Sequence, residues 1–247
     1  MNLYGLIGYP LGHSFSKKYF NDKFKKEAFA ENSFGNYEMK DLSELTELIK
    51  TTRNLKGLSV TIPHKQNVLG HLTWAEDIVK YIGACNCIKI RRGQLFGYNT
   101  DVIGFEKALM KNLNANHTKA LILGRGGGAK AVSFVLDKLH VDYYFVERNS
   151  NPQDKRTISY DGLAGQDIAS HPLIINCTPL GMFPDVKGYP PIPYEAITNK
   201  HYLFDLTYNP PKSEFLLKGE RKGAIIQNGY NMLVYQAEES WRIWNED

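Results

Sequence analysis

The sequence predicts an α/β protein with two domains and largely parallel sheets. Its 247 residues suit one large or two medium domains, because a domain usually has about 100–200 residues. Short apolar runs bounded by Gly, Pro, Asn or Asp alternate with segments of helical period, which is typical of α/β proteins. With 43% hydrophobic and 23% charged residues, the composition excludes a disordered chain, a collagen-like fibre and a disulfide-stapled miniature.

Strands and helices are expected to alternate along the whole chain. The strands are predicted at residues 3–7, 37–39, 57–62, 85–90, 120–123, 143–146, 173–176, 202–206 and 224–226. The helices are predicted at residues 16–30, 42–52, 73–81, 102–113, 129–139 and 231–244. Asp41, and Thr100 or Asp101, stand where N-cap residues are preferred, so they mark two of the helix starts.

Charge, cysteine content and hydropathy exclude several classes of partner. The net charge of +4 comes from scattered basic residues, whereas a nucleic-acid-binding protein would gather them in one stripe. Cys85 and Cys87 are too close for the usual zinc spacing, so we expect no metal site, and three cysteines make no disulfide framework. The first residues do not resemble a signal peptide, and no apolar run reaches about 18 residues. We therefore expect a cytoplasmic protein without a membrane or nucleic-acid partner.

A boundary between the two domains is expected near the polar stretch 114–119, just before a glycine-rich segment. The predicted helix 102–113 would bridge the two halves. The last predicted helix has apolar residues spread widely around it, so it should be buried on more than one side. We expect this helix to return to the first half and to close a cleft between the domains. The predicted domains are residues 1–101 with 230–247, and residues 102–229.

The segment ALILGRGGGA (120–129) leads from a predicted strand through a glycine-rich turn into a predicted helix. A dinucleotide-binding fingerprint of the Rossmann type requires this context. Gly124 would permit the tight turn and Gly126 the close approach of the backbone to a pyrophosphate, which free N–H groups of the helix would face. The residues expected to bind a dinucleotide here are Gly124, Arg125, Gly126, Gly127 and Gly128.

The next predicted strand ends at Glu147 and Arg148. An acidic residue at this point of a dinucleotide-binding domain binds the ribose 2′-OH of NAD, whereas an arginine accepts the 2′-phosphate of NADP. Because the chain has both residues side by side, their position alone leaves NAD and NADP open.

Polar side chains that can do chemistry recur where the strands of the first half end. Ser14 and Ser16 follow the first strand, where two hydroxyls and a helix N-terminus can bind a carboxylate. Lys65 follows the third strand, and Asp101 follows a predicted hairpin. Oxidation of a secondary alcohol by a nicotinamide needs a group that takes the hydroxyl proton, and a lysine near a carboxylate meets this need. We expect Lys65 and Asp101 to form that pair.

The motifs and their order resemble those of the shikimate dehydrogenase family. They are GYPLGHSFS (8–16), SVTIPHK (59–65), GACN (83–86), GYNTD (97–101), the glycine turn, NCTPLGM (176–182), DLTYNP (205–210) and, after Gly229, MLVYQA (232–237). This resemblance covers nearly the whole chain. The cofactor region departs from the family pattern: Arg125 and Gly128 stand where the family usually has alanine. Glu147 and Asn149 stand where its NADP enzymes usually have asparagine and threonine, and Pro152 stands where a second arginine usually follows.

The resemblance implies a three-layer α/β/α substrate domain at the N-terminus and a Rossmann-type dinucleotide-binding domain. It also implies reversible NADPH-dependent reduction of 3-dehydroshikimate to shikimate, a step of aromatic amino-acid and chorismate biosynthesis. Lys65 would relay the proton, and Asp101 would orient Lys65 and the substrate hydroxyl. The residues implied to hold the substrate are Ser14, Ser16, Thr61, Asn86, Tyr208 and Gln236. Gly229 would lie beside the nicotinamide. Because Arg148 is retained, NADP is expected, with NAD as the alternative.

Two other functions are compatible with the sequence. A relative that also oxidises quinate differs in how the carboxylate end of the substrate is bound, which the sequence does not distinguish. A non-catalytic dinucleotide-binding module would have lost chemically active residues, yet Lys65, Asp101 and Gln236 are all present. Either a monomer or a homodimer is expected, because the family includes both.

Overall fold

The computed structural model of the chain describes residues 1–12, 15–149 and 153–246. These residues form two compact units. Unit 1 consists of Met1–Thr100 and the segment from Gln236 onward, and unit 2 is Asp101–Tyr235. The division falls inside two helices, α5 (Thr100–Leu109) and α9 (Tyr230–Asn245). The domain bounds derived from the sequence, 1–101 with 230–247 and 102–229, stay a prediction.

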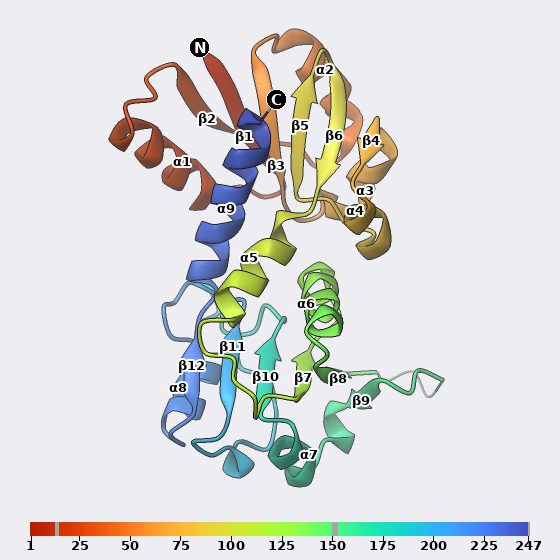
Figure 1. Ribbon diagram of the computed structural model, residues 1–247, viewed down its shortest axis with the longest axis vertical. Coiled ribbons are helices and arrows are strands. Elements are labelled where there is room, and N and C mark those ends of the chain that lie inside the picture. Colours follow the sequence, from red (N-terminus) through yellow and green to blue (C-terminus); the bar gives the residue numbers. More distant parts are fainter. Residues whose placement is uncertain (13–14, 150–152, 247) are drawn as a thin grey trace. The chain divides into compact units, whose positions relative to one another are not determined.

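The sheet of unit 1 has the strand order β2-β1-β3-β5-β6-β4 (Figure 1). Its strands are β1 (Asn2–Gly8), β2 (Asn32–Glu38), β3 (Leu55–Val60), β4 (Trp74–Ala75), β5 (Cys87–Arg91) and β6 (Gln94–Tyr98). β1 is parallel to both of its neighbours, β2 and β3. β5 is antiparallel to β3 and β6, and β4 is parallel to β6. The parallel part therefore contains the strand ends that the sequence analysis associates with a ligand.

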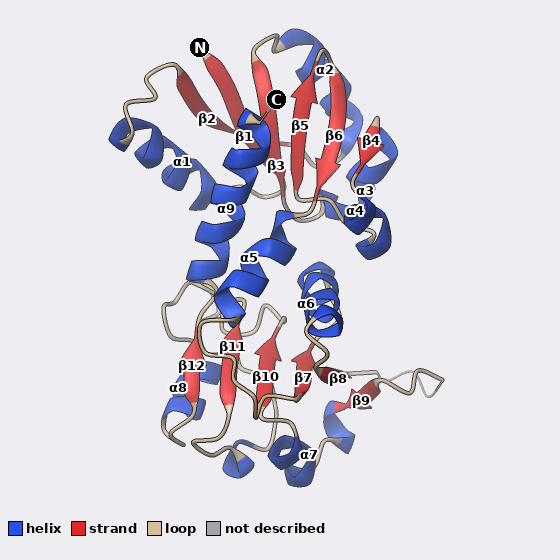
Figure 2. Cartoon of the chain, in the orientation of Figure 1, coloured by secondary structure: helices blue, strands red, loops and turns tan. Residues whose placement is uncertain are grey.

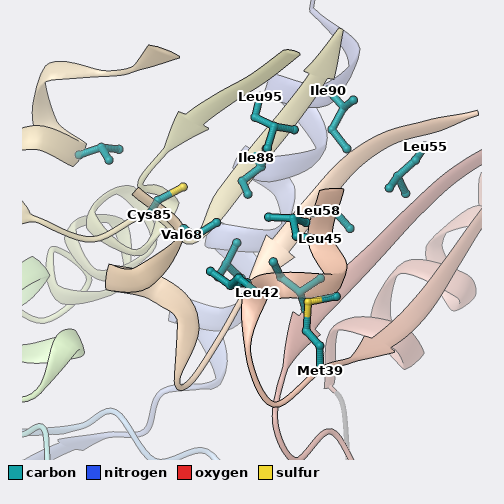
Figure 3. Packing of buried hydrophobic residues seen from close by; sticks show 13 residues of the cluster. Met39, Leu42, Leu45, Leu55, Leu58, Val68, Cys85, Ile88, Ile90 and Leu95 are labelled. Atoms are coloured by element: carbon teal, nitrogen blue, oxygen red, sulfur yellow. The ribbon is translucent and has the colours of Figure 1, made fainter. Parts of the chain in front are cut away.

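Both faces of this sheet are buried, because successive side chains of a strand point to opposite faces. On β1, Leu3 and Ile7 belong to one hydrophobic cluster, and Tyr4 and Leu6 belong to another. Figure 3 shows the first cluster, in which Leu58 and Ile88 of the sheet lie among residues such as Leu42 and Leu45. The second cluster joins the sheet to α1 and α9. This arrangement confirms the three-layer fold predicted for the N-terminal part.

All helices of unit 1 except α9 lie in the connections between its strands, and α9 follows the last strand of the chain (Figure 2). They are α1 (Phe15–Lys26), η1 (Leu42–Glu44), α2 (Leu45–Thr51), α3 (His64–Asn67), η2 (Val68–His71), α4 (Asp77–Ile82) and the part of α9 from Gln236. Trp244 of α9 contacts the face that carries Tyr4, with ring centroids 5.1 Å apart. Its indole N–H donates to the Ile88 carbonyl over 3.0 Å, which fixes the end of α9 on the sheet.

The sheet of unit 2 has six parallel strands in the order β12-β11-β10-β7-β8-β9. They are β7 (Lys119–Leu123), β8 (Asp142–Glu147), β9 (Thr157–Ser159), β10 (Leu173–Asn176), β11 (Tyr202–Asp205) and β12 (Ile225–Gln227). Numbered from β7, this is the order 6-5-4-1-2-3 of a doubly wound dinucleotide-binding fold. The strand order reverses between β7 and β10, and ligands of such folds bind at that point.

The helices of unit 2 cover its sheet. They are α5 from Asp101, α6 (Gly127–Lys138), η3 (Tyr160–Gly162), α7 (Gly165–Ser170), η4 (Tyr194–Ala196), α8 (Glu214–Glu220) and the start of α9. Phe105 of α5 packs edge-on against Phe204 of β11, with ring centroids 5.1 Å apart. Within the described part of the chain, no helix is long and apolar enough to cross a membrane, and no cluster of potential metal ligands is found.

The α/β class predicted from the sequence is confirmed, and most predicted elements are present with ends shifted by a few residues. The helix predicted at 73–81 is wrong in its first part, because Trp74–Ala75 pairs with β6 and α4 begins only at Asp77. β9 was not predicted as a strand, and β6 was predicted only as part of the hairpin before Asp101. The helices α3, α7 and α8 were not predicted. Asp41 caps a helix as predicted, since its carboxylate accepts a hydrogen bond from the Ser43 N–H.

The contact between Gly57 and Trp244 gives a test of this packing. A Cβ on Gly57 would lie 2.4 Å from the indole ring of Trp244, which is held by its hydrogen bond to the sheet. We expect Gly57→Ala to lower the free energy of unfolding, measured in urea, by about 1–3 kcal/mol. Gly70→Ala is the matched control, since no described atom lies within 4 Å of its Cβ position. Equal effects of the two substitutions would contradict the proposed packing.

Candidate active site

In unit 1, predicted substrate residues follow the carboxyl ends of β1 and β3. The two strands are parallel neighbours, so both leave the sheet at the same edge. Backbone hydrogen bonds tie these exits together: the Thr61 N–H donates to the Ile7 carbonyl over 2.9 Å, and the Tyr9 N–H donates to the Ile62 carbonyl over 3.0 Å. Thr61 is half-buried at this edge. The carboxyl ends of parallel strands are where open α/β sheets bind their ligands.

Lys65 and Ser16 begin the helices that follow these two strands. Lys65 is the second residue of α3 and is half-buried, and its carbonyl accepts the Cys85 N–H over 2.7 Å. Ser16 is the second residue of α1 and is half-buried as well. A hydroxyl in the first turn of a helix lies beside unpaired backbone N–H groups, which favour an anion. Ser14, which is predicted to act together with Ser16, lies outside the described residues.

The side chain of Asn86 is the centre of a buried polar network that also contains Thr100, Gln236 and Ser240. The Asn86 Oδ1 accepts the Thr100 N–H over 2.6 Å. Its Nδ2 donates to the Thr100 hydroxyl over 3.0 Å and lies 3.4 Å from the Gln236 Oε1. All four residues are buried. We call these four residues the Asn86 network.

Ser240 completes the network from the far side of Thr100. Its hydroxyl donates to the Gln236 carbonyl over 2.8 Å, and it lies 3.1 Å from the Thr100 hydroxyl. The Thr100 hydroxyl also lies 3.3 Å from the Asn86 Oδ1 and 3.5 Å from the Gln236 Oε1, so it contacts all three other members of the network. From the sequence, Thr100 was predicted only as a candidate helix N-cap, and no role was predicted for Ser240. The position of Ser240 four residues after Gln236, on the same face of a helix, is the signal that could have found it.

Asp101 is buried at the second position of α5, directly after Thr100. A carboxylate in the first turn of a helix is favoured by the helix dipole. Lys65 belongs to unit 1 and Asp101 to unit 2. Their pairing therefore stays a prediction.

In unit 2, β7 runs into α6 through the predicted glycine turn. Gly124 has a φ of +89°, a left-handed conformation that glycine adopts without strain. At Gly126 and Gly127, no described atom lies within 4 Å of the Cβ position. Gly126 is the N-cap of α6, and no described side chain caps the helix there. The turn thus leaves room for a ligand at the helix N-terminus, where backbone N–H groups and the dipole favour a phosphate.

A cavity of about 490 Å³ lies beside this turn within unit 2. Five of the predicted cofactor residues line it: Gly124, Arg125, Gly126, Glu147 and Arg148. The other lining residues are Tyr160, Asp161, Cys177, Thr178, Pro179, Leu180 and Pro191. The other predicted cofactor residues, Gly127, Gly128 and Gly229, are not among the described residues that line this cavity. The volume lies within the range of about 300–1,000 Å³ that small-molecule and cofactor sites occupy.

Tyr160 presents an unpartnered hydroxyl in the lining of this cavity. The hydroxyl oxygen is buried and has no hydrogen-bond partner among the described residues. Burial raises the pKa of Tyr160 to about 12, so the group is a donor at neutral pH. A buried unpaired hydroxyl costs about 1–3 kcal/mol. The open glycine turn and the cavity together fit a dinucleotide. No sequence motif singled out Tyr160.

A second buried polar group, the carboxylate of Asp205, joins the ends of β10 and β11. Its Oδ1 accepts the Asn176 side-chain N–H over 3.0 Å and the Thr207 backbone N–H over 2.9 Å. Its Oδ2 accepts a hydrogen bond from the Ser213 hydroxyl. Burial raises the pKa of Asp205 to about 6, although these hydrogen bonds oppose the shift. The sequence analysis recognised the motif DLTYNP but gave Asp205 no role.

Tyr208 and Gly229 lie on the chain that Asp205 organises. Tyr208 follows Thr207 and is half-buried, and burial raises the pKa of its phenol. The Gly229 N–H donates to the Thr207 carbonyl over 3.0 Å. A Cβ on Gly229 would lie 2.2 Å from the Leu206 carbonyl oxygen, so only glycine fits there. The predicted roles of Tyr208 toward substrate and of Gly229 toward a nicotinamide stay predictions.

Known proteins match the chain along its whole length. Over 254 residues it is 38% identical to the shikimate dehydrogenase (NADP(+)) of Clostridium beijerinckii, a match that covers 100% of this chain and 93% of that relative. The chain belongs to the shikimate dehydrogenase family. The family model of the shikimate dehydrogenase substrate binding domain matches residues 6–88. Within unit 1, this span holds Ser16, Thr61, Lys65 and Asn86.

Solved structures of the shikimate dehydrogenase family have the same fold. The chorismate mutase/shikimate 5-dehydrogenase fusion protein of Clostridium acetobutylicum matches with a TM-score of 0.87 and 35% identity, covering 99% of this chain and 91% of that one. The shikimate 5-dehydrogenase of Thermus thermophilus, solved with NADP(H) and shikimate, matches with a TM-score of 0.84 and 27% identity, covering 99% and 94%. The predicted Rossmann-type architecture of the second half is thereby confirmed.

The raised pKa of Asp205 predicts a pH dependence of stability. Its pKa is about 6 in the folded protein and near 3.8 when unfolded, so the folded state holds the proton more tightly. The contribution of Asp205 to stability is therefore full below about pH 4 and is lost as the pH rises through about 6. Asp205→Asn keeps one acceptor oxygen and does not titrate; its amide N–H group replaces the second oxygen, so the Ser213 hydroxyl must accept there instead of donating.

We expect the difference in free energy of unfolding, wild type minus Asp205→Asn, to fall by about 1–3 kcal/mol between about pH 4 and pH 7. Urea unfolding at a series of pH values measures it. A difference that stays constant, or that grows with pH, would contradict a raised pKa at Asp205.

Proposed function

We propose that this chain catalyses the reversible, NADPH-dependent reduction of 3-dehydroshikimate to shikimate, a step of aromatic amino-acid biosynthesis. The match along the whole chain to a shikimate dehydrogenase (NADP(+)) carries the proposal. Each unit supports it separately. Unit 1 has polar side chains at the carboxyl edge of its sheet, and unit 2 has the glycine turn and cavity that fit a dinucleotide.

The substrate is proposed to bind through hydroxyl and amide groups of unit 1. Ser16, together with Ser14, would bind the carboxylate at the start of α1, where helix N–H groups favour an anion. Thr61, Asn86 and Gln236 would bind the ring hydroxyls, and Tyr208 of unit 2 would bind there as well. The Asn86 network supports this role, because hydrogen bonds within it hold the Asn86 and Gln236 amides in fixed positions before a ligand arrives.

Lys65 is proposed to move the proton. In the oxidation direction, its neutral amine accepts the proton of the substrate hydroxyl while the carbon–oxygen double bond forms; in reduction it returns the proton to the carbonyl oxygen. Asp101 would orient Lys65 and the hydroxyl. The bound nicotinamide accepts or supplies the hydride. Ordering these groups in one site lowers the barrier, because their encounter costs no further entropy during the reaction.

The cofactor is proposed to be NADP, held by unit 2. The Gly124–Gly128 turn and the N-terminus of α6 would bind the pyrophosphate, and Gly229 would lie beside the nicotinamide. Arg148, which lines the cavity, would bind the 2′-phosphate. The relatives named as NADP(+) enzymes support this choice. Glu147 in the same lining is the residue that would favour NAD.

We further propose that the protein acts in the cytoplasm, as a monomer or a homodimer. Cys85, Cys87 and Cys177 are free thiols, which suits a reducing compartment. Burial raises the pKa of the Cys87 and Cys177 thiols, so both are protonated at neutral pH.

Steady-state kinetics of the purified chain tests the function. Shikimate and quinate are each oxidised with NADP+ and with NAD+, and the four values of kcat/KM are compared. We expect shikimate with NADP+ to give the highest value. Equal or better use of quinate would favour the quinate/shikimate enzyme instead. No oxidation of either acid would contradict the family's activity for this chain and favour a non-catalytic binding module.

The Lys65→Ala variant, measured in the same assay, tests whether Lys65 transfers the proton. We expect kcat to fall by a factor of about 10²–10⁴, the usual contribution of a general acid–base group. Lys80→Ala is the control, because Lys80 is an exposed lysine of unit 1 that pairs with Asp77. A wild-type kcat in the Lys65→Ala enzyme would contradict the proposed role of Lys65 in proton transfer.

A further inference from the structure

The side chain of Arg125 links the glycine turn to β8 and to the chain that leads into β9. Its guanidinium lies over the Phe145 ring, 4.7 Å from the ring centroid. One terminal nitrogen is 2.7 Å from the Asp154 Oδ2, and the other is 3.5 Å from the Glu147 Oε1. The second nitrogen is also 3.4 Å from the Thr157 hydroxyl. Although the side chain is 43% exposed, its charged end is held at one place from several sides.

Asp154 acts as the anchor of this arrangement. Its Oδ1 accepts the Arg156 backbone N–H over 3.0 Å, so its Oδ2 is turned toward Arg125. An arginine has several N–H groups in a rigid fork, so one side can bind the anchor while the other faces a second carboxylate. The second carboxylate here is Glu147.

Glu147 stands where a dinucleotide-binding domain distinguishes NAD from NADP. It is the last residue of β8, and a carboxylate at this point accepts the ribose 2′-OH of NAD. The same carboxylate repels a 2′-phosphate, because like charges in a partly desolvated site are unfavourable. Glu147 is only 22% exposed, so water screens its charge incompletely.

The charges of the cavity lining show what Arg125 changes. Among the lining residues, Arg125 and Arg148 are positive and Glu147 and Asp161 are negative, and the Arg125 charge is shared with Asp154 beside the lining. Without Arg125 the lining would carry a net negative charge. Arg148 alone would have to offset Glu147 and bind a phosphate at the same time.

We propose that Arg125 is a specificity-determining residue of this chain: it is the counter-ion of Glu147 and thereby lets the cavity accept a 2′-phosphate. The inference rests on the proposed function in one respect, that the cavity holds the adenosine end of NADP. Glu147 then stays in the lining without selecting NAD. Arg125 acts on the nucleotide through Glu147, and Asp154 keeps it in position.

Binding of adenosine fragments tests this without catalysis. Titration calorimetry at low ionic strength gives the Kd of 2′,5′-ADP, which carries the 2′-phosphate, and of 5′-AMP, which lacks it. The ratio of the two values is the 2′-phosphate preference. It is measured for the wild type, Arg125→Ala, Arg125→Lys, Glu147→Gln and the double variant Arg125→Ala/Glu147→Gln. Circular dichroism and Tm establish that each variant is folded.

A counter-ion role predicts a distinct pattern across these proteins. Arg125→Ala should lower the preference at least about tenfold, and removing the Glu147 charge as well should restore most of it. Arg125→Lys should keep most of the preference, and Glu147→Gln alone should change it by less than about threefold, since Arg125 already offsets that charge. A double variant as poor as Arg125→Ala, or an Arg125→Ala protein with the wild-type preference, would overturn the inference.

Arg156→Ala is the matched control. Like Arg125, Arg156 lies over an aromatic ring of β8, 5.0 Å from the centroid of Tyr143, and it pairs with a carboxylate, that of Asp137. It is not among the described residues of the cavity lining. Its substitution should leave the preference unchanged, and a loss equal to that of Arg125→Ala would overturn the assignment. Wild-type protein that binds neither fragment nor NADP+ would instead contradict the proposed function itself.

Discussion

A buried amide must have all its hydrogen bonds satisfied, and in unit 1 the amide of Asn86 finds its partners in two distant segments. Thr100 comes from the start of α5, and Gln236 with Ser240 comes from α9. Leaving any one of these groups unpaired would cost about 1–3 kcal/mol. The network therefore fixes where α5 begins and how α9 lies on unit 1. The same residues form one side of the proposed substrate site, so stability and binding depend on one set of contacts.

In unit 2, the buried or partly buried polar groups are paired through charged side chains. The Asp205 carboxylate is buried among Asn176, Thr207 and Ser213, and it sets the course of the chain beyond β11. At the glycine turn, the charge of Arg125 is distributed between two carboxylates. The buried polar groups of unit 1 are thus held by neutral amides and hydroxyls, and those around the glycine turn of unit 2 by paired charges. This separation makes it possible to alter substrate and cofactor binding one at a time.

The sequence predicted those elements whose signal is local. Apolar runs such as Leu173–Asn176 and the glycine turn carry their own pattern, so strand, turn and helix were found there. β4, with two residues, and β9, with three, are too short for a period and depend on their neighbours in the sheet.

Some residues of the candidate site could be predicted from the sequence and others could not, for the same reason as the secondary-structure elements. Residues at strand ends, such as Lys65 and Glu147, could be proposed because their place in the fold is known once the strands are known. Thr100, Ser240 and Tyr160 could not, because their importance lies in contacts with residues far away in the sequence. The ion pair of Arg125 with Glu147 could not be predicted from the sequence either, because the two residues are 22 positions apart.

We propose that the Asn86 network prepares the substrate site of unit 1 separately from the cofactor site of unit 2. The most direct measurement is the Kd of shikimate and of NADP+ for a folded Thr100→Val protein, which keeps the shape of the side chain and loses its hydroxyl. The account predicts that shikimate binding weakens about tenfold, because Asn86 and Ser240 lose a partner. NADP+ binding should stay unchanged. Unchanged shikimate binding, or an equal loss for both ligands, would contradict the claim.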